Sequence, residues 1–238
     1  MTILADVFRP GTFPDALRFI GDNPGLIWDK TVEHLVLAGA ALGVAFVVAV
    51  PLGVWLGHLH RGSFLAVNLG NVGRALPSLA IIAILLPFLG IGFTNVLVAL
   101  VVLAAAPMLT NAYVAVDTVD SDVVEAARGM GMRGREILTR VELPLAVPLI
   151  FAGIRTAAVF VVSTATIAAI AGGGGLGDII VNQASYRLEG VIGAALCVTA
   201  LAFAADLALG ALQRAVSPRG LRRSPSLEPG VVTGPVAE

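Results

Sequence analysis

A polar stretch from Glu125 to Pro144, EAARGMGMRGREILTRVELP, interrupts an otherwise very apolar chain. It begins with Glu125-Ala126-Ala127, has Gly131 six residues after the glutamate, and ends in Val-Glu-Leu-Pro at Pro144. Small residues and exposed methionines, here Met130 and Met132, suit a short helix that inserts into a groove on another protein. The chemistry that we expect here is non-covalent docking. A solvated loop in which Glu125 only caps a helix is the alternative.

Two glycine-rich stretches look like phosphate-binding loops but lack the required context. The letters GMGMRG at 129–134 match GxGxxG, yet a dinucleotide site needs a preceding strand within a βαβ unit. The run from Gly172 to Gly177 lacks the GxxxxGKS/T pattern, and the only lysine of the chain is Lys30. We therefore expect no P-loop in this chain. The Gly172–Gly177 run is interpreted as a turn.

Other reactive residues are sparse. His34, His58 and His60 lie at the ends of apolar segments, without further ligand-type residues at metal spacing. Cys197, the only cysteine, lies in an apolar segment and cannot form a disulfide within one chain. We predict no metal site, no cofactor and no catalytic residue, and thus no enzyme.

The composition indicates an integral membrane protein. Of 238 residues, 57% are hydrophobic and 13% charged, about half the ~25% charged residues of a soluble domain. Residues 1–30 mix charges and prolines without the apolar run of a signal peptide, and a short amphipathic helix is expected at Pro14–Ile20. The arginines lie in separate short loops, which disfavours nucleic acid as a partner.

Five transmembrane helices are predicted in an all-α fold, because about 20 apolar residues cross a bilayer. Leu35–Gly57 is the first. Ala75–Val116 is charge-free for twice the required length and should form two helices with a turn at residues 90–95. The fourth and fifth are expected at about 146–171 and 190–212.

The arginines predict the orientation, since cytoplasmic loops are rich in Arg and Lys. They concentrate in the loop between the first two spans, in the Glu125–Pro144 stretch and after the last span. With five spans these regions share one side, so the N-terminus is expected outside and the C-terminus in the cytoplasm. The predicted division is an extracytoplasmic tail at 1–33, a transmembrane domain at 34–214 with a cytoplasmic loop at 117–145, and a disordered cytoplasmic tail at 215–238.

The polar stretch itself should form two short helices. Asp122 is expected to cap the first, with Glu125 completing a capping box. Gly129 and Gly131 should end it. A second helix from Arg133 to Arg140 should end near residues 141–143, because Pro144 disfavours helix in the residue before it.

Polar residues inside the spans are candidates for a solute path. Thr156, Ser163 and Thr166 should share one face of the fourth span, and Asn111 and Tyr113 are weaker candidates in the third. Helix packing with hydroxyls bonded to their own backbone is the alternative. Arg155 and Asp206 lie deep in apolar spans, and we favour structural pairing or an inter-subunit contact over solute binding.

The spacing of Glu125-Ala126-Ala127, Gly131, Leu143 and Pro144 resembles the EAA loop of inner-membrane permease subunits of ATP-driven, binding-protein-dependent importers. Val141 replaces the usual Ile. The resemblance implies a type I importer permease fold, like that of the methionine importer permease. It also implies that these residues, with Gly129, couple the chain to cytoplasmic ATP-binding subunits. The implied partners are those ATPases, a second identical or homologous permease chain and an extracytoplasmic solute-binding protein.

Further stretches resemble the osmoprotectant branch of this family, which imports glycine betaine, choline or carnitine. They are LPSLA at 76–80, PFLGIG at 87–92, ARGMGM at 127–132, GIRTA at 153–157 and GGGLG at 173–177. Thr110-Asn111 stands where relatives have Arg-Asn, which leaves the solute open. Import of an amino acid or organic anion, a self-sufficient channel or secondary transporter, and a pure scaffold subunit are the alternatives.

Overall fold

A computed structural model describes residues 11–64, 68, 70, 73 and 76–217. Every regular element in these ranges is helical, which confirms the all-α prediction. In chain order these are α2 Thr12–Asp22, α3 Pro24–His58, α5 Ser78–Leu89, α6 Phe93–Asp117, α7 Ser121–Gly129, α8 Gly134–Ile137, the π-helical η1 Leu138–Glu142, α9 Leu143–Thr164, the 3-10 helix η2 Ala165–Ala171, α10 Gly177–Val181 and α11 Gln183–Val216.

The membrane-crossing helices agree in part with the five that the sequence predicts. Within the described residues, four helical stretches are long and apolar enough to cross a membrane: Pro24–His58, Phe93–Asp117, Gly134–Ala171 and Gln183–Val216. The remaining apolar helix, α5, has 12 residues and so a length of about 18 Å, well short of a hydrocarbon core of about 30 Å. The predicted span beginning at Ala75 is therefore shorter than expected, and most of residues 65–75 lie outside the described part.

The predicted turn at residues 90–95 is confirmed. Between α5 and α6, Gly90 and Gly92 have φ values of 71° and 134°, a region open mainly to glycine. Asn95 Nδ2 donates a hydrogen bond to the Gly90 carbonyl (2.8 Å), which ties the start of α6 back across the turn.

Several predicted boundaries shift. The first span begins earlier, because α3 starts at Pro24 and includes the last ten residues of the expected tail at 1–33. The amphipathic helix expected at Pro14–Ile20 is present as the longer α2. The last span agrees better: Arg187 has non-helical angles (φ 57°, ψ −177°) and the helix is regular from there to Val216. The tail after residue 217 lies outside the described residues, and so does Arg74. Three of the arginines used to predict the orientation are in that tail.

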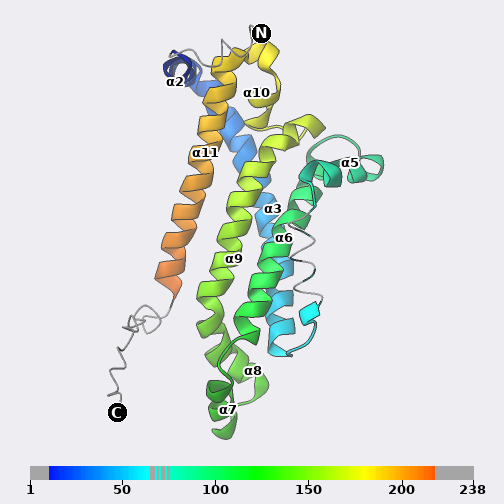
Figure 1. Ribbon diagram of the computed structural model, residues 1–238, viewed down its shortest axis with the longest axis vertical. Coiled ribbons are helices and arrows are strands. Elements are labelled where there is room, and N and C mark those ends of the chain that lie inside the picture. The colour runs from blue at the N-terminus through cyan, green and yellow to red at the C-terminus, as the bar shows by residue number, and fades with distance from the viewer. Residues whose placement is uncertain (1–10, 65–67, 69, 71–72, 74–75, 218–238) are drawn as a thin grey trace, which may run out of the picture.

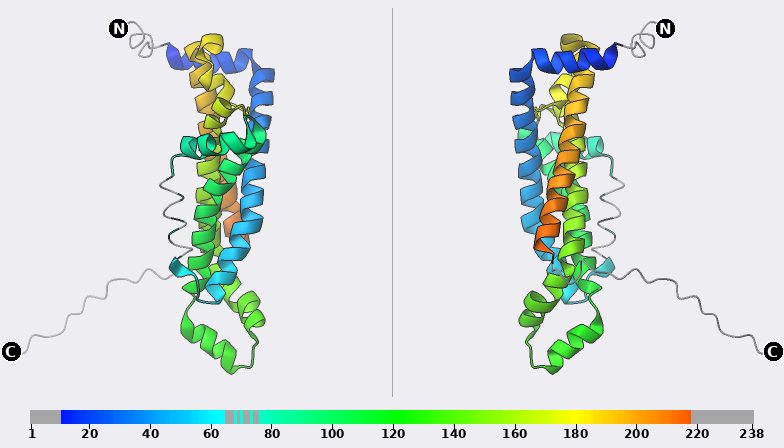
Figure 2. Two further views of the ribbon diagram at one scale, coloured as in Figure 1. Left: turned by 90° about the vertical axis from the view of Figure 1, so that its right-hand side faces the viewer. Right: turned by 90° about the vertical axis from the view of Figure 1, so that its left-hand side faces the viewer.

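Figures 1 and 2 show the helices as an elongated bundle, with α3, α6 and α9 side by side and α11 along α9. At one end α2 lies across the bundle, near α10 and the start of α11. We call this the α2 end. At the opposite end α7 and α8 project beyond the long helices, and we call it the α7 end.

Small residues bring α3 and α6 into close contact. The buried residues of α3 include Ala38, Ala41, Ala45 and Ala49, which face a core shared with α6. Nearer the α7 end, Gly53 and Gly57 lie against the α6 backbone: a Cβ at Gly53 would stand 2.6 Å from the Leu109 oxygen, and one at Gly57 2.7 Å from the Tyr113 oxygen. Small residues four apart are the usual means by which membrane helices approach closely.

A matched pair of glycine substitutions in α3 tests this packing. Gly53→Ala should lower the unfolding free energy by about 1–3 kcal/mol, because its methyl group overlaps the α6 backbone. Gly43→Ala, where nothing lies within 4 Å of the added Cβ, should raise it by about 0.5–1 kcal/mol, the usual gain of alanine over glycine in a helix. Thermal unfolding of both variants in one detergent measures the difference. Equal melting temperatures would contradict the packing described.

Candidate functional site

The first helix of the polar stretch is capped by a different residue from the one predicted. Asp120 is the N-cap of α7, and its Oδ1 accepts a hydrogen bond from the Asp122 amide (2.9 Å). The predicted cap by Asp122, with a capping box to Glu125, is therefore wrong. Two aspartates two residues apart are equally suitable caps by type, and the backbone extends at Asp120 (ψ 121°) rather than at Asp122. Glu125 is exposed on the second turn of α7.

Gly131 forms the turn between α7 and α8. Its φ is +84°, and Met132 N then donates to the Ala127 carbonyl (3.2 Å). Gly129 is the last residue of α7 rather than a helix breaker. On the far side of the turn, Glu136 Oε2 accepts from the Arg133 amide (2.8 Å) and caps α8. Both ends of the turn are thus closed by hydrogen bonds.

The chain does not leave the helical conformation before Pro144, contrary to the sequence-based expectation. Residues Leu138–Glu142 form the π-helical η1, and α9 begins at Leu143. A proline ring clashes with the carbonyl four residues earlier and offers no amide hydrogen. A wider π turn is one means of accommodating such a residue within a continuous helix. From α8 onward, the polar stretch and the fourth span are therefore one helical rod.

Three exposed apolar residues lie along one side of α7 and its C-cap. They are Val123 and Met130, 42% and 76% exposed, and Ala126, spaced as i, i+3 and i+7. Ala127 in α7 and Ile137 in α8 are buried, each 2% exposed. We call Val123, Ala126 and Met130 the α7 patch. It is an apolar knob, and the exposed charged residues Glu125 and Arg128 lie on other sides of α7. The sequence analysis selected Glu125 and Ala126 but did not include Val123.

A hydrogen bond to a buried carboxylate fixes this loop to the bundle. Glu142, 2% exposed, accepts a hydrogen bond from His58 Nδ1 (2.6 Å), which joins η1 to the end of α3. His60 Nδ1 makes a similar contact with Asp117 Oδ1 (2.9 Å), but its side chain is 61% exposed. The sequence analysis missed the role of Glu142. The sequence did contain a signal: Glu142 stands between the aliphatic Val141 and Leu143, and His58 lies at the end of the first span.

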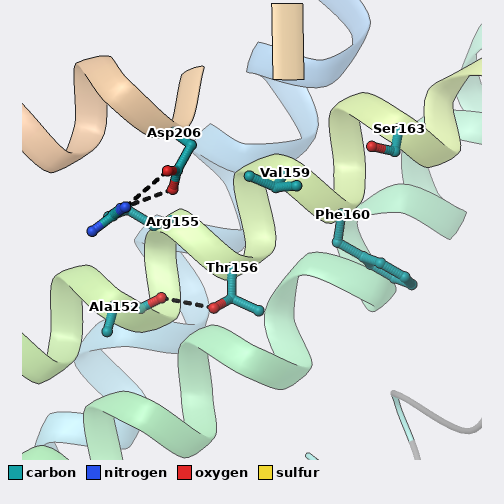
Figure 3. Close-up of a pocket in the computed structure, with 7 residues that line it drawn as sticks. All are labelled: Ala152, Arg155, Thr156, Val159, Phe160, Ser163 and Asp206. Atoms are coloured by element: carbon teal, nitrogen blue, oxygen red, sulfur yellow. Dashed lines mark hydrogen bonds and ion pairs between the residues drawn. The ribbon is translucent and has the colours of Figure 1, made fainter. Parts of the chain in front are cut away.

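Two of the predicted solute-path residues line a cavity of about 580 Å³ beside α9. Thr156 and Ser163 lie in its wall together with Phe160 and the side chains of Arg155 and Asp206 (Figure 3). The Thr156 hydroxyl donates to the Ala152 carbonyl (2.9 Å), as the packing alternative expects. Its oxygen lone pairs stay available as acceptors, since hydroxyls have two.

The other three path candidates lie elsewhere. Tyr113 is 3% exposed in the contact between α6 and α3. Asn111 Nδ2 donates to the Pro107 carbonyl (2.8 Å), and its Cβ abuts Gly153 of α9. Thr166 falls in η2, where the helix tightens, and its hydroxyl donates to the Ser163 carbonyl (2.7 Å). The spacing rule for an α-helix therefore holds for Thr156 and Ser163 but not for Thr166.

Arg155 and Asp206 form a bidentate ion pair between α9 and α11. Arg155 Nε and Nη2 donate to the two carboxylate oxygens at 2.9 and 2.8 Å, as Figure 3 shows. Gln213 extends the link, because its Nε2 donates to the Pro148 carbonyl (3.0 Å) and its Oε1 accepts from Arg155 (3.3 Å). The pairing favoured by the sequence analysis is confirmed, within one chain.

At the α2 end, the glycine run forms the expected turn after the fourth span. Gly172, Gly174 and Gly175 have positive φ values, and the Gly175 amide donates to Glu33 Oε2 (3.0 Å). Lys30 Nζ joins Glu33 to Asp178 at 2.8 Å each. In the described ranges no three His, Cys, Asp or Glu side chains gather as a metal site.

A matched pair of histidine substitutions tests the anchor of the loop. His58→Ala leaves the buried Glu142 without its partner and should cost about 1–3 kcal/mol. His60→Asn, in which asparagine tolerates the positive φ of residue 60, should change stability by no more than about 0.5 kcal/mol, as expected for a surface position. Hydrogen exchange should become faster at the amides of residues 121–142 in the first variant only. Unchanged exchange in His58→Ala would refute the anchor.

Comparison with known proteins identifies the family. Residues 49–219 match the family described as binding-protein-dependent transport system inner membrane component. The chain is 40% identical over 207 residues to the glycine betaine/carnitine/choline transport system permease protein of Bacillus subtilis, covering 87% of this chain and 95% of that one. It is 33% identical over 214 residues to the osmoprotectant import permease protein of Salmonella typhimurium, with 87% and 100% covered.

The fold resembles a solved membrane transporter. An inward-facing structure of the MetNI methionine ABC transporter superposes with a TM-score of 0.71 at 21% identity, covering 82% of this chain and 99% of that one. This likeness supports the fold expected from the sequence. With an all-α bundle, long apolar helices and a profile match over more than half of its length, the chain belongs to the family of inner-membrane components of binding-protein-dependent transport systems.

Proposed function

We propose that this chain is the permease subunit of an ATP-driven importer of an osmoprotectant of the glycine betaine, choline or carnitine type. The observation that carries the proposal is the α7 patch, an exposed apolar knob on a loop held rigidly by buried contacts at the end of a membrane bundle. Ala126 and Met130 of this patch lie within the Glu125–Pro144 stretch that resembles the EAA loop of the family, and Val123 precedes that stretch by two residues. The relatives from B. subtilis and S. typhimurium, both similar over nearly their whole lengths, supply the solute class.

The α7 end is proposed to face the cytoplasm, with the N-terminus outside. Six arginines of the described residues lie at or near this end, and Lys30 and a smaller number of arginines, mixed with acids, lie at the other. The six are Arg61, Arg128, Arg133, Arg135, Arg140 and Arg214. Such an asymmetry favours a cytoplasmic position, which is where an ATPase would meet the α7 patch.

Coupling is proposed to run through the helical rod from α8 to α9. An ATPase groove that moves on ATP binding would displace the α7 patch. Beyond the Gly131 turn, α8, η1 and α9 are continuous, so that a displacement passed on to α8 reaches Arg155 and Thr156 without a further loop. Alternating access would follow if the ATPase binds the two orientations of this rod with different affinity. Glu125, Ala126, Gly129, Gly131, Leu143 and Pro144 are assigned to this coupling surface or its support, and the buried Ala127 to its support.

The solute path is proposed to pass the exposed face of α9, between this chain and a second permease chain. Thr156 and Ser163 face the cavity beside α9 and present hydroxyl oxygens in an apolar wall. Asn111, Tyr113 and Thr166 have a weaker claim, because in this conformation they contact neighbouring helices or backbone. An extracytoplasmic binding protein would supply tight recognition, since this chain has few aromatic residues for an ammonium cage.

Charge reversal separates the coupling surface from the rest of the chain. Glu125→Lys should abolish co-purification of the ATPase and reduce uptake by at least about tenfold, equivalent to roughly 1.4 kcal/mol of binding. Glu189→Lys reverses a charge at the α2 end and should leave ATPase co-purification unchanged. The measurement is the ATPase-to-permease ratio after affinity purification from membranes. Retention of the ATPase by Glu125→Lys, with normal uptake, would exclude the coupling role.

Competition for uptake tests the solute class. In proteoliposomes containing the assembled transporter and its binding protein, unlabelled glycine betaine, choline or carnitine should compete with a labelled member of this group. Methionine should not compete, because it lacks a quaternary ammonium group. Labelled uptake that none of the three reduces would overturn the osmoprotectant assignment, while the ATPase ratio would still report on the importer assignment.

A further inference from the structure

The short helix α2 has a second surface that the transport function does not use. It lies across the α2 end of the bundle (Figures 1 and 2) and packs against the first turns of α11. Ala16, fully buried, faces Gly193, where an added Cβ would stand 3.2 Å from the Ala16 carbonyl oxygen. Asn23 Nδ2 donates to the Phe19 carbonyl (3.0 Å) and closes the helix before Pro24 starts α3. Contacts with α11 and the direct connection to α3 thus fix the position of α2.

The contacts of α2 show which of its flanks faces along the bundle. Phe19 lies beside Gly190, and Ile20 beside Gly193, one turn further along α11 towards the membrane. Asp15, Arg18 and Asp22 border a hollow that they share with Arg187 and Glu189, which precede Gly190. The charged flank therefore points away from the bundle, and the Ile20 flank points along it towards the spans.

Two large apolar side chains stand on the flank that faces the spans. Phe13 and Leu17 precede Ile20 by seven and three residues and so share its side of the helix. They are 65% and 63% exposed, although Ala16 between them is fully buried. Nearby, Trp28 in the first turns of α3 is 68% exposed. Tryptophan at such a level is typical of the membrane–water interface.

We propose that α2 is an interfacial helix, with Phe13 and Leu17 inserted into the lipid leaflet on its side and Asp15, Arg18 and Asp22 in water. The occupant of the apolar flank is lipid, because this flank continues the exposed apolar surface of the spans, which includes Trp28 and Leu196. An amphipathic helix parallel to a bilayer buries its apolar side at the level of the headgroups and the first acyl carbons. The inference depends on membrane embedding alone, not on the solute or the orientation.

Site-directed spin labelling of the assembled transporter in lipid nanodiscs tests this placement. The only native cysteine, Cys197, is first replaced by alanine. Labels are then attached in separate variants, Phe13→Cys and Leu17→Cys on the apolar flank and Arg18→Cys on the charged flank. Collisions with oxygen, which dissolves in lipid, and with a water-soluble nickel chelate are measured for each label. Uptake by each labelled variant serves as the check that the transporter is assembled.

The expected result is a severalfold higher oxygen-to-nickel collision ratio at residues 13 and 17 than at residue 18. Equal ratios would place the apolar flank in water and overturn the proposal. Labels at 13 and 17 that are shielded from both reagents would show a protein partner instead of lipid, and this outcome would also overturn it. Residues 13 and 17 are one helical turn apart, so similar collision ratios at both would show that neither label has distorted the helix locally.

Discussion

The close approach of helix backbones at α6 is the constraint on which the rest of the structure depends. In lipid there is no hydrophobic force that drives one apolar helix against another, so packing must supply the attraction. Gly53 and Gly57 bring α3 against one side of α6, and Gly153 brings α9 against Asn111 and Pro107 of the same helix. The side chains of the α9 face and the loop beyond it are oriented by these contacts. The functional surfaces thus depend on glycines that touch no ligand.

Much of the fold could be predicted from the sequence because its signals are local. Charge-free runs predicted the apolar helices, and Gly90 and Gly92 predicted the turn between α5 and α6. The path of the chain from η1 into α9 could not be predicted, because a proline usually indicates a helix end, and only the tertiary support from His58 and Glu142 shows why the helix continues. The second predicted span agrees only in part, as the 12-residue α5, because apolar composition does not report how long a helix is or the angle at which it lies.

In the candidate site, too, some features follow from local sequence signals and others depend on tertiary contacts. Glu125, Ala126 and Gly131 could be selected from type and spacing alone, and the structure explains Gly131 by its positive φ. Val123 could be recognised only from the structure, since its 42% exposure depends on how α7 packs against its neighbours. Tyr113 is a residue whose role the sequence leaves open. A polar aromatic residue in a span resembles a path residue in the sequence, but which neighbour a face meets is a property of the bundle.

The π-helical η1 has a geometric consequence for the loop that it carries. An α-helix turns by about 100° per residue, and a π turn accommodates one residue more than an α turn. The direction in which the α7 patch points around the axis of α9 is therefore set by the five residues Leu138–Glu142. Without the extra residue, the same patch would be swung about 100° around the rod, with the cavity beside α9 unmoved. The direction of the α7 patch and the lining of the cavity are therefore determined by different turns of one continuous helix.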